Sequence, residues 1–286
     1  MRITIQFPPD NTFLSNIFYE GLLFLSQYGL RDTSHLCINV DKKAFVNCFA
    51  GLSNEHLKDL DVPLVGNDVL HNIDLKIFEA LGCQVEKGKR EVKIEDKTLR
   101  LDRYNFGTIL AILKEIFIMA PEAIPLKEDI LIFILVNGKI MKIIAEGSRK
   151  ECTVLQLFKV DRYTGITSIE SDFTTRQLTL KMSTEPLLLS LLGIYSSYVT
   201  SHKTKKRNSY YFLFLSPEQI LEILNEKPGM IKAFFQVKNY AIGVLKEILR
   251  GYPSNELILA EIGLNLELVN LLTLHSLDKI SLMLFR

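Results

Sequence analysis

The sequence is poor in the residues on which small secreted domains and zinc-binding domains depend. It has no Trp and only four cysteines in 286 residues, and the cysteines are Cys37, Cys48, Cys83 and Cys152. No two of them form a CxxC pair, and no His lies at zinc-finger spacing from them. A chain of this length buries enough apolar surface to fold without cross-links. We therefore interpret the cysteines as reduced core residues of a cytosolic protein.

Local signatures of common enzyme classes are also missing. The chain has no GxGxxG, GxxxxGK[ST], GxSxG or HExxH motif, although each of these marks a well-understood chemistry. Its five histidines are not spaced to share a helical turn, and none is followed by Asp: they are His35, His56, His71, His202 and His275. The sequence therefore predicts no enzymatic activity, no metal and no small-molecule cofactor.

Targeting segments and a charge excess are lacking as well. The opening MRITIQFPPD has no apolar signal-peptide core, and the longest nearly apolar stretch, residues 186–199, is too short to span a bilayer. This pattern predicts a cytoplasmic protein with no membrane partner. Lys and Arg number 34 against 33 Asp and Glu, a net charge of +1, so any contact with nucleic acid must come from a local patch.

The first half of the sequence shows strand patterns around two apolar helices. Residues 2–7 alternate apolar and polar positions as a half-buried strand does, and the periodicity predicts an apolar helix over 11–29 that has Glu20 as its one charge. The pair Asn137 and Gly138 favours a type I′ turn in a hairpin. The remaining predicted elements are a strand at 34–40, short helices at 55–60 and 72–81, a meander at 83–103, a helix at 104–121, hairpin strands at 129–136 and 139–145, and strands at 153–160, 166–169 and 177–182.

The composition changes to helical patterns after Met182. We expect Thr184 to cap a helix over 184–199 and Ser216 to cap one over 217–226. The strand SYYFLFL lies between them, the longest helix follows at 228–253, and the apolar tail 254–286 also favours helix. The predicted fold class is therefore α+β. Residues 1–183 form an N-terminal domain with a mainly antiparallel sheet plus helices, and residues 184–286 form a mainly helical domain with one inserted strand, packed closely against it.

One short stretch, HKTKKRNSYY, is unusually basic. Lys203, Lys205, Lys206 and Arg207 lie within five positions with no acid among them. A connector with this charge suits a phosphate backbone, and neighbouring aromatic rings can stack on bases. These four residues, with His202 and Tyr210 as lesser candidates, form the predicted nucleic-acid-binding site; a solvated loop and a contact to an acidic protein are the alternatives.

The meander at 83–103 is a second charged surface. Its seven basic residues outnumber its five acidic ones, but the mixed signs favour a merely solvated face. Glu91 and Lys93 also match the E-x-K part of a nuclease pattern, in which a strand carries a carboxylate and an ammonium on one face. Alternating charge is equally typical of any exposed strand.

The order and character of the elements resemble those of a known family. An N-terminal strand, the helix NIFYEGLLFLSQYG, a long hairpin, SYYFLFLSPEQILEIL and a helical C-terminal half are similar to the large subunit of archaeal type I-A CRISPR (Cascade-like) effector complexes. The resemblance implies a non-catalytic subunit that helps to recognise a short flanking motif and to hold opened DNA, while a guide RNA reads the target. Its partners would be CRISPR RNA and target DNA within a multi-subunit complex, and other effector subunits that contact the helical domain.

Two other functions remain open on the sequence. The first is an archaeal or viral scaffold protein that binds only proteins, which fits the 48% hydrophobic content and the mean hydropathy of +0.16. The second is a metal-dependent nuclease that uses Glu91 and Lys93. It requires two further acids placed by the fold.

Overall fold

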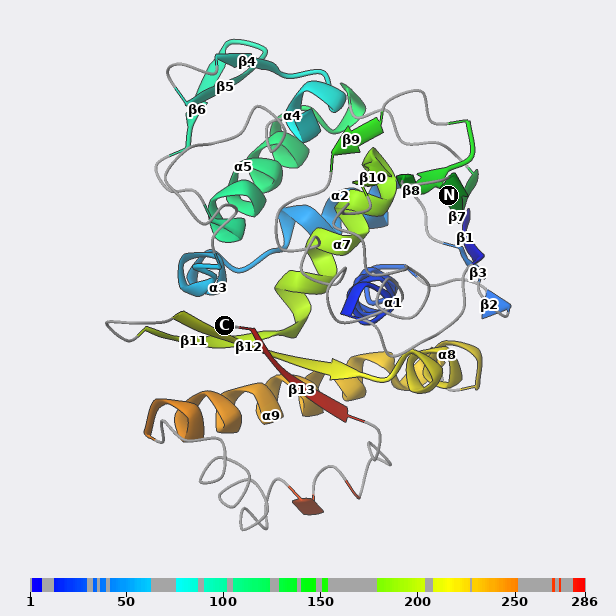
Figure 1. Cartoon of the computed structure of the whole chain (residues 1–286), viewed down its shortest axis with the longest axis vertical. Helices are drawn as coiled ribbons and strands as arrows, with labels where there is room; N and C mark the ends of the chain where they lie inside the picture. The colour runs from blue at the N-terminus through cyan, green and yellow to red at the C-terminus, as the bar shows by residue number, and fades with distance from the viewer. Residues whose placement is uncertain are drawn as a thin grey trace.

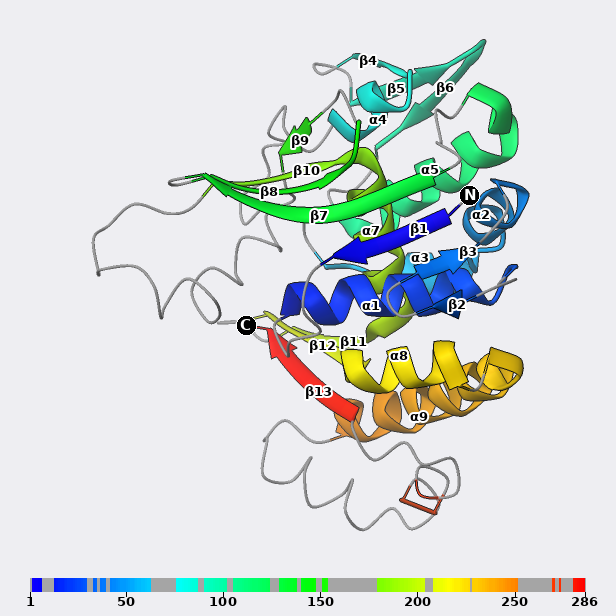
Figure 2. The same cartoon turned by 90° about the vertical axis from the view of Figure 1, so that its right-hand side faces the viewer.

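The computed structural model has a mixed α+β fold in which two sheets lie on either side of a helical layer (Figures 1 and 2). The prediction of the fold class is confirmed. The structure describes residues 2–6, 13–29, 33–34, 37–39, 42–62, 76–86, 90–101, 105–123, 129–137, 140–147, 151–153, 179–203, 208–226, 228–251, 269–270, 273 and 280–285.

The larger sheet has seven strands in the order β2-β3-β1-β7-β8-β10-β9. Four of its six pairings are antiparallel, but β1 pairs with β7 and β8 pairs with β10 in parallel. The prediction of a mainly antiparallel sheet is therefore confirmed, and the two parallel pairings are additions that the sequence did not indicate. The strands are β1 (Arg2–Gln6), β2 (Thr33–Ser34), β3 (Cys37–Asn39), β7 (Asp129–Asn137), β8 (Ile140–Ala145), β9 (Glu151–Thr153) and β10 (Thr179–Ser183).

The predicted hairpin is present as β7 and β8. Asn137 is the last residue of β7 and pairs with Ile140, so it belongs to the strand rather than to the turn. Gly138 lies outside the described residues, as do the predicted strand at 166–169 and most of the one at 153–160.

Two central helices, α1 (Phe13–Ser26) and α7 (Thr184–Ser197), cross at very close range. A Cβ on Gly21 would lie 2.0 Å from the backbone O of Leu189, and one on Gly193 would lie 1.9 Å from the backbone O of Ile17. Only glycine at both positions allows the two backbones to approach this closely. Every residue of α7 is buried, which explains why its sequence shows no polar face.

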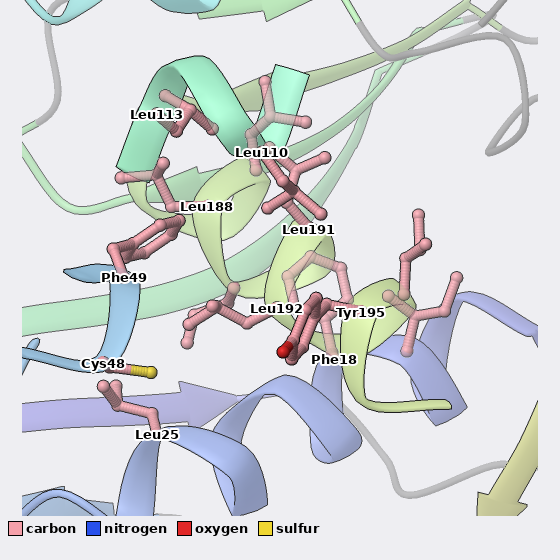
Figure 3. Close-up of a cluster of buried hydrophobic side chains, with 14 of the residues drawn as sticks. Phe18, Leu25, Cys48, Phe49, Leu110, Leu113, Leu188, Leu191, Leu192 and Tyr195 are labelled. Atoms are coloured by element: carbon pink, nitrogen blue, oxygen red, sulfur yellow. The ribbon is translucent and has the colours of Figure 1, made fainter. Parts of the chain in front are cut away.

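The remaining elements of the first half surround this crossing. Phe49 and Phe117 stack with centroids 4.2 Å apart, and α7 packs its leucines against α5 and against α1 and α2 (Figure 3). These elements are α2 (Lys42–Ala50), α3 (Asn54–Asp59), α4 (Lys76–Ala80), α5 (Phe106–Met119), the short helix η1 (Pro121–Ala123) and the meander strands β4 (Gln84–Glu86), β5 (Glu91–Ile94) and β6 (Lys97–Arg100).

The smaller sheet, β11-β12-β13, has a helix on each face. Phe13 of α1 packs edge-on against Phe212 and Phe214 on one face, while Tyr211 and Leu213 on the other face join a cluster with α9. Both faces of β12 are buried, which accounts for its nearly continuous apolar sequence. The elements are β11 (Tyr198–Lys203), β12 (Asn208–Leu215), α8 (Pro217–Glu226), η3 (Pro228–Met230), α9 (Ile231–Gly251) and β13 (Ile280–Phe285).

The end of the chain differs from the prediction. Residues 280–285 form β13, which pairs antiparallel with β12 from Leu215↔Ile280 to Tyr210↔Phe285. The helical prediction for the tail is therefore wrong at residues 280–285, and the described part of the second half has three strands where one was expected. The physical reason is that β13 satisfies the backbone hydrogen bonds of a β12 edge that would otherwise be unpaired.

Two predicted helix caps have different outcomes. Ser216 caps α8 as expected, because its hydroxyl accepts a hydrogen bond from the N–H of Gln219 at 3.2 Å. Thr184 is the first residue of α7 and not its cap. The cap position belongs to Ser183, whose hydroxyl instead accepts from the N–H of Ala145 in β8.

The core continues across residue 183, where we expected the two domains to meet. One cluster of buried side chains runs from Ile3 of β1 to Val237 of α9, so the two segments share a core as well as an interface. None of the helices in the described ranges is long and apolar enough to cross a membrane.

Candidate nucleic-acid interface

The basic stretch joins the two strands of the β11–β12 hairpin. The register pairs Lys203, at the end of β11, with Asn208, at the start of β12. Lys205, Lys206 and Arg207 fall between these two positions in sequence and lie outside the described residues. The hairpin is at one side of the molecule, below α3 in the view of Figure 1. The strands on either side of this connector are therefore paired as far as Lys203 and Asn208.

Lys203 is not an uncompensated cation. Its ammonium forms an ion pair with the carboxylate of Asp61, just after α3. The other carboxylate oxygen of Asp61 accepts a hydrogen bond from the Tyr198 hydroxyl at 3.1 Å. Because Asp61 holds both ends of β11, Lys203 anchors the hairpin, and the sequence-based picture of four unpaired cations does not hold for it.

Tyr210 and Tyr211 are both buried, at 8% and 6% exposure. We expected at least one ring to be open to a base. Neither is open in this structure, because α9 covers the face of β12 that the first half leaves free. Burial, with a smaller contribution from the Asp61 charge, raises the pKa of Tyr210. His202 is half-buried beside Lys203 on β11.

Short polar contacts hold α3 against the last turn of α7, just before the hairpin begins. His56 Nε2 lies 2.8 Å from the carbonyl O of Tyr195, and the Tyr195 hydroxyl accepts a hydrogen bond from the Ser53 N–H at 2.8 Å. Burial lowers the pKa of His56 below its ordinary value. The neutral ring donates from Nε2 to the Tyr195 carbonyl. Nearby, Lys246 of α9 donates to the Asp59 carboxylate at 2.5 Å.

A buried ion pair joins four elements beneath the hairpin. Glu20 of α1 accepts hydrogen bonds from Lys238 of α9 at 2.5 Å and from the backbone N–H of Leu215 in β12 at 2.7 Å. The Ser196 hydroxyl of α7 accepts from Lys238 at 3.2 Å. Glu20 is fully buried and Lys238 is 3% exposed. Burial lowers the pKa of Lys238, and the Glu20 charge opposes that shift.

This cluster ties the two halves together and is enclosed, so we assign it a structural role. Glu20 stands out in the sequence as the one charge of an apolar helix, but its partner Lys238 was not predicted. A signal was present: Lys238 interrupts the apolar stripe of α9 between Phe235 and Ala241. A lysine on a buried stripe indicates a buried carboxylate elsewhere.

The described residues contain no convergent metal site. No three of their His, Cys, Asp and Glu side chains lie close enough together to hold a metal ion. Lys93, the cation of the E-x-K pair, forms an ion pair with Glu86 across the meander. Cys48 and Cys83 are buried and free, and burial raises the pKa of both thiols, that of Cys83 to about 11. For these two cysteines the expected place in the core is confirmed.

Comparison with known proteins gives one informative match. No protein-family model matches the chain, and no solved structure matches it. An uncharacterized protein of Archaeoglobus fulgidus is 36% identical over 288 residues, an alignment that covers all of this chain and 67% of that protein. The chain belongs to the same family as this archaeal protein. The alignment covers the whole fold described above. About a third of the length of the Archaeoglobus protein lies outside the alignment.

Proposed function

We propose that the protein is a non-catalytic, nucleic-acid-binding subunit of a larger assembly, and that the tip of the β11–β12 hairpin is its contact to the phosphate backbone. The observation that carries the proposal is the register of the hairpin, which ends at Lys203 and Asn208 and leaves Lys205, Lys206 and Arg207 to connect the strands. A cluster of cations with no acid among them attracts the phosphate backbone of a nucleic acid.

The anchoring of the hairpin supports this role. A connector contributes more to binding when its base is fixed, because less conformational freedom is lost on contact. Asp61 fixes β11 through Lys203 and Tyr198, and both faces of β12 are packed. Lys203 therefore serves mainly as an anchor, and the binding charge belongs to the three residues that follow it.

The assembly within this proposal is the RNA-guided CRISPR complex of the type I-A class, in which the protein helps to bind target DNA beside a guide RNA. The support is the resemblance in element order over the whole chain, together with an archaeal family member. In that role neighbouring subunits pack against the second half of the chain and the protein works in the cytoplasm.

The contact is tested by changing Lys205, Lys206 and Arg207 together to Ala and leaving Lys203 in place. Fluorescence anisotropy with a 20-nucleotide single-stranded DNA, over a series of salt concentrations, measures affinity. Each phosphate contact to a single strand contributes about 0.7 to the log–log salt slope, so we expect the slope to fall by about 2 and the affinity to fall at least tenfold.

The control removes three exposed lysines from other elements, Lys43 of α2, Lys76 of α4 and Lys232 of α9. Equal losses in both variants would mean that only overall charge matters, and unchanged binding in the hairpin variant would remove the hairpin from the interface. A wild-type protein that binds no nucleic acid would overturn the proposal in favour of a scaffold that binds only proteins.

The assembly is tested by purifying the tagged full chain from its host at low salt and sequencing any RNA that accompanies it. We expect guide-length RNA and further subunits in a fixed ratio. Recovery of the protein alone, or with proteins but no RNA, would contradict the CRISPR assignment while leaving the DNA-binding measurement to stand separately.

A further inference from the structure

A groove of about 580 Å³ lies on the opposite side of α3 from the hairpin, between α3, α5 and β6. Its size is within the range of ligand-binding clefts. Three cationic side chains line it, Lys58, Arg100 and Lys114, against one carboxylate, Glu115. The remaining lining combines polar and apolar residues: Asn54, Asn105, Thr108, Leu57, Leu99, Gly107, Ala111 and Ile112.

Close contacts between α3 and α5 make the walls of this groove rigid. At one end the N–H of Gly107 donates to the carbonyl O of Leu60 at 3.1 Å, and a Cβ on Gly107 would lie 2.1 Å from the carbonyl O of Leu57. At the other end Lys114 donates to the carbonyl O of Leu52 at 2.7 Å and to Oδ1 of Asn54 at 2.8 Å. The helices are therefore held together at both ends of α3, and the groove exists before any ligand arrives.

Apart from Glu115, the lining of the groove contains no acid beside its three cations. Lys114 donates to two uncharged oxygens, those of Leu52 and Asn54, so these contacts do not neutralise its positive charge. Lys58 and Arg100 are exposed. On the hairpin side of α3 the acids are already used, since Asp59 pairs with Lys246 and Asp61 pairs with Lys203. The fold thus pairs Asp59 and Asp61 on the hairpin side of α3, and the groove on the other side has three cations against one carboxylate.

We propose that this groove is a second contact for single-stranded nucleic acid, with Lys58, Arg100 and Lys114 receiving phosphates and the apolar lining lying beneath the bases. The identity of the ligand rests on the proposed function, whereas the site is separate from the hairpin. In Figure 1 the hairpin, α3, α5 and the meander follow one another along the same side of the molecule. A strand that leaves the hairpin tip can therefore pass α3 and reach the groove.

A nucleic acid fits this lining better than an acidic peptide does. The lining combines cations with the apolar side chains of Leu57, Leu99 and Ile112, and sequence-tolerant binding of single strands combines a cationic track for the backbone with apolar contacts for the bases. Oδ1 of Asn105 accepts a hydrogen bond from the N–H of Thr108 at 2.8 Å. Its amide N–H₂ is left as a donor for a base or a phosphate.

The test uses the same 20-nucleotide DNA and the full chain. The variant Lys58→Ala/Arg100→Ala is expected to bind about tenfold more weakly, with a salt slope smaller by about 1.4. The matched control is Lys43→Ala/Lys232→Ala, which removes two exposed lysines from α2 and α9. Because Arg100 belongs to β6 and pairs in register with Glu91 of β5, the single variant Lys58→Glu, on an exposed position of α3, repeats the test without touching β6.

The outcomes separate this inference from the proposed function. Weaker binding in the hairpin variant with unchanged affinity and slope in both groove variants would overturn the groove and leave the hairpin. Weaker binding only in the groove variants would support the groove and overturn the hairpin. Absence of binding by the wild type would overturn both. Displacement of the DNA by polyglutamate at equal charge concentration would mean an acidic protein partner, and would also overturn the inference.

Discussion

The buried pair of Glu20 and Lys238 gives the sharpest prediction about stability. Changing Glu20 to Gln preserves the size of the side chain and an acceptor for the Leu215 N–H, but leaves the Lys238 ammonium 3% exposed with only the Ser196 hydroxyl nearby. Removing one partner of a buried ion pair typically costs about 3–5 kcal/mol. For a chain of this size each kcal/mol corresponds to about 2–4 °C in melting temperature, so we expect a decrease of about 6–20 °C.

The double variant Glu20→Gln/Lys238→Met identifies the cause of that loss. It removes both charges, keeps the acceptor for Leu215, and replaces the lysine with an apolar side chain of similar length that can pack beside Phe235. Because the uncompensated charge is gone, the double variant should lose less than either single variant. Exchanging a buried pair for apolar groups is often neutral. We expect a coupling free energy of at least about 2 kcal/mol in the double-mutant cycle.

Urea unfolding followed by circular dichroism measures both quantities, and an unchanged m value shows that the variants differ in stability rather than in the compactness of the unfolded chain. The reasoning would be refuted if Glu20→Gln lost less than about 1 kcal/mol, which is the size of an ordinary hydrogen bond. It would equally be refuted if the losses of the single variants simply added. Either result would mean that water reaches the pair, and that α1 and α9 separate in solution.

Two further predictions concern the elements around this pair. The variant Gly193→Ala should destabilise the protein by about 1–3 kcal/mol or more, since its Cβ would lie 1.9 Å from the backbone O of Ile17. The control variant Gly243→Ala in α9, where nothing lies within 4 Å of the added Cβ, should stabilise it by up to about 1 kcal/mol. Equal shifts in melting temperature for the two variants would contradict the close crossing of α1 and α7. Burial holds the pKa of His56 below its ordinary value, so the unfolded chain binds the extra proton first, and stability should fall as the pH drops below about 6.5. The slope cannot exceed about 1.4 kcal/mol per pH unit for one proton, and His56→Gln should flatten it in parallel thermal melts; an equally steep wild-type and variant profile would assign the effect to other groups.

Local patterns were sufficient for the helices and the hairpin. The period of 3.6 residues predicted α1, α5 and α9, because each buries a face or its whole surface. The alternation in RITIQF predicted β1. In these segments the same residues determine both the local conformation and the buried side, so no distant information is needed.

Long-range pairing could not be read from the sequence. The strand character of residues 280–285 depends on β12, about seventy residues earlier in the chain, because that strand offers the partner hydrogen bonds. The parallel pairing of β1 with β7 likewise joins Arg2 to Asp129. An apolar segment without strong periodicity fits either helix or strand. Its conformation is decided by the strand edge with which it can form hydrogen bonds.

The candidate site shows the same division between local and distant information. Sequence located the cations of the hairpin, because a run of like charge is visible locally, but it missed Asp61, which lies 142 positions before Lys203 and pairs with it. It also misjudged Tyr210 and Tyr211, whose second buried face is supplied by α9. A sequence pattern can locate a cluster of charges, but which of these charges form ion pairs depends on the fold.

The placement of acids around α3 links the two proposed contacts. Asp59 and Asp61 both face the hairpin side, where Lys246 and Lys203 satisfy them, and the opposite side of the same short helix carries Lys58 into the groove. These pairs neutralise two of the carboxylates that would otherwise repel a phosphate strand as it passes α3, whereas Glu55 and Glu115 take no part in them. The anchors of the hairpin and the electrostatics of the groove are thus consequences of a single arrangement, in which ion pairs hold α3 against the hairpin and α9 while Lys58, Arg100 and Lys114 line the groove on its other side.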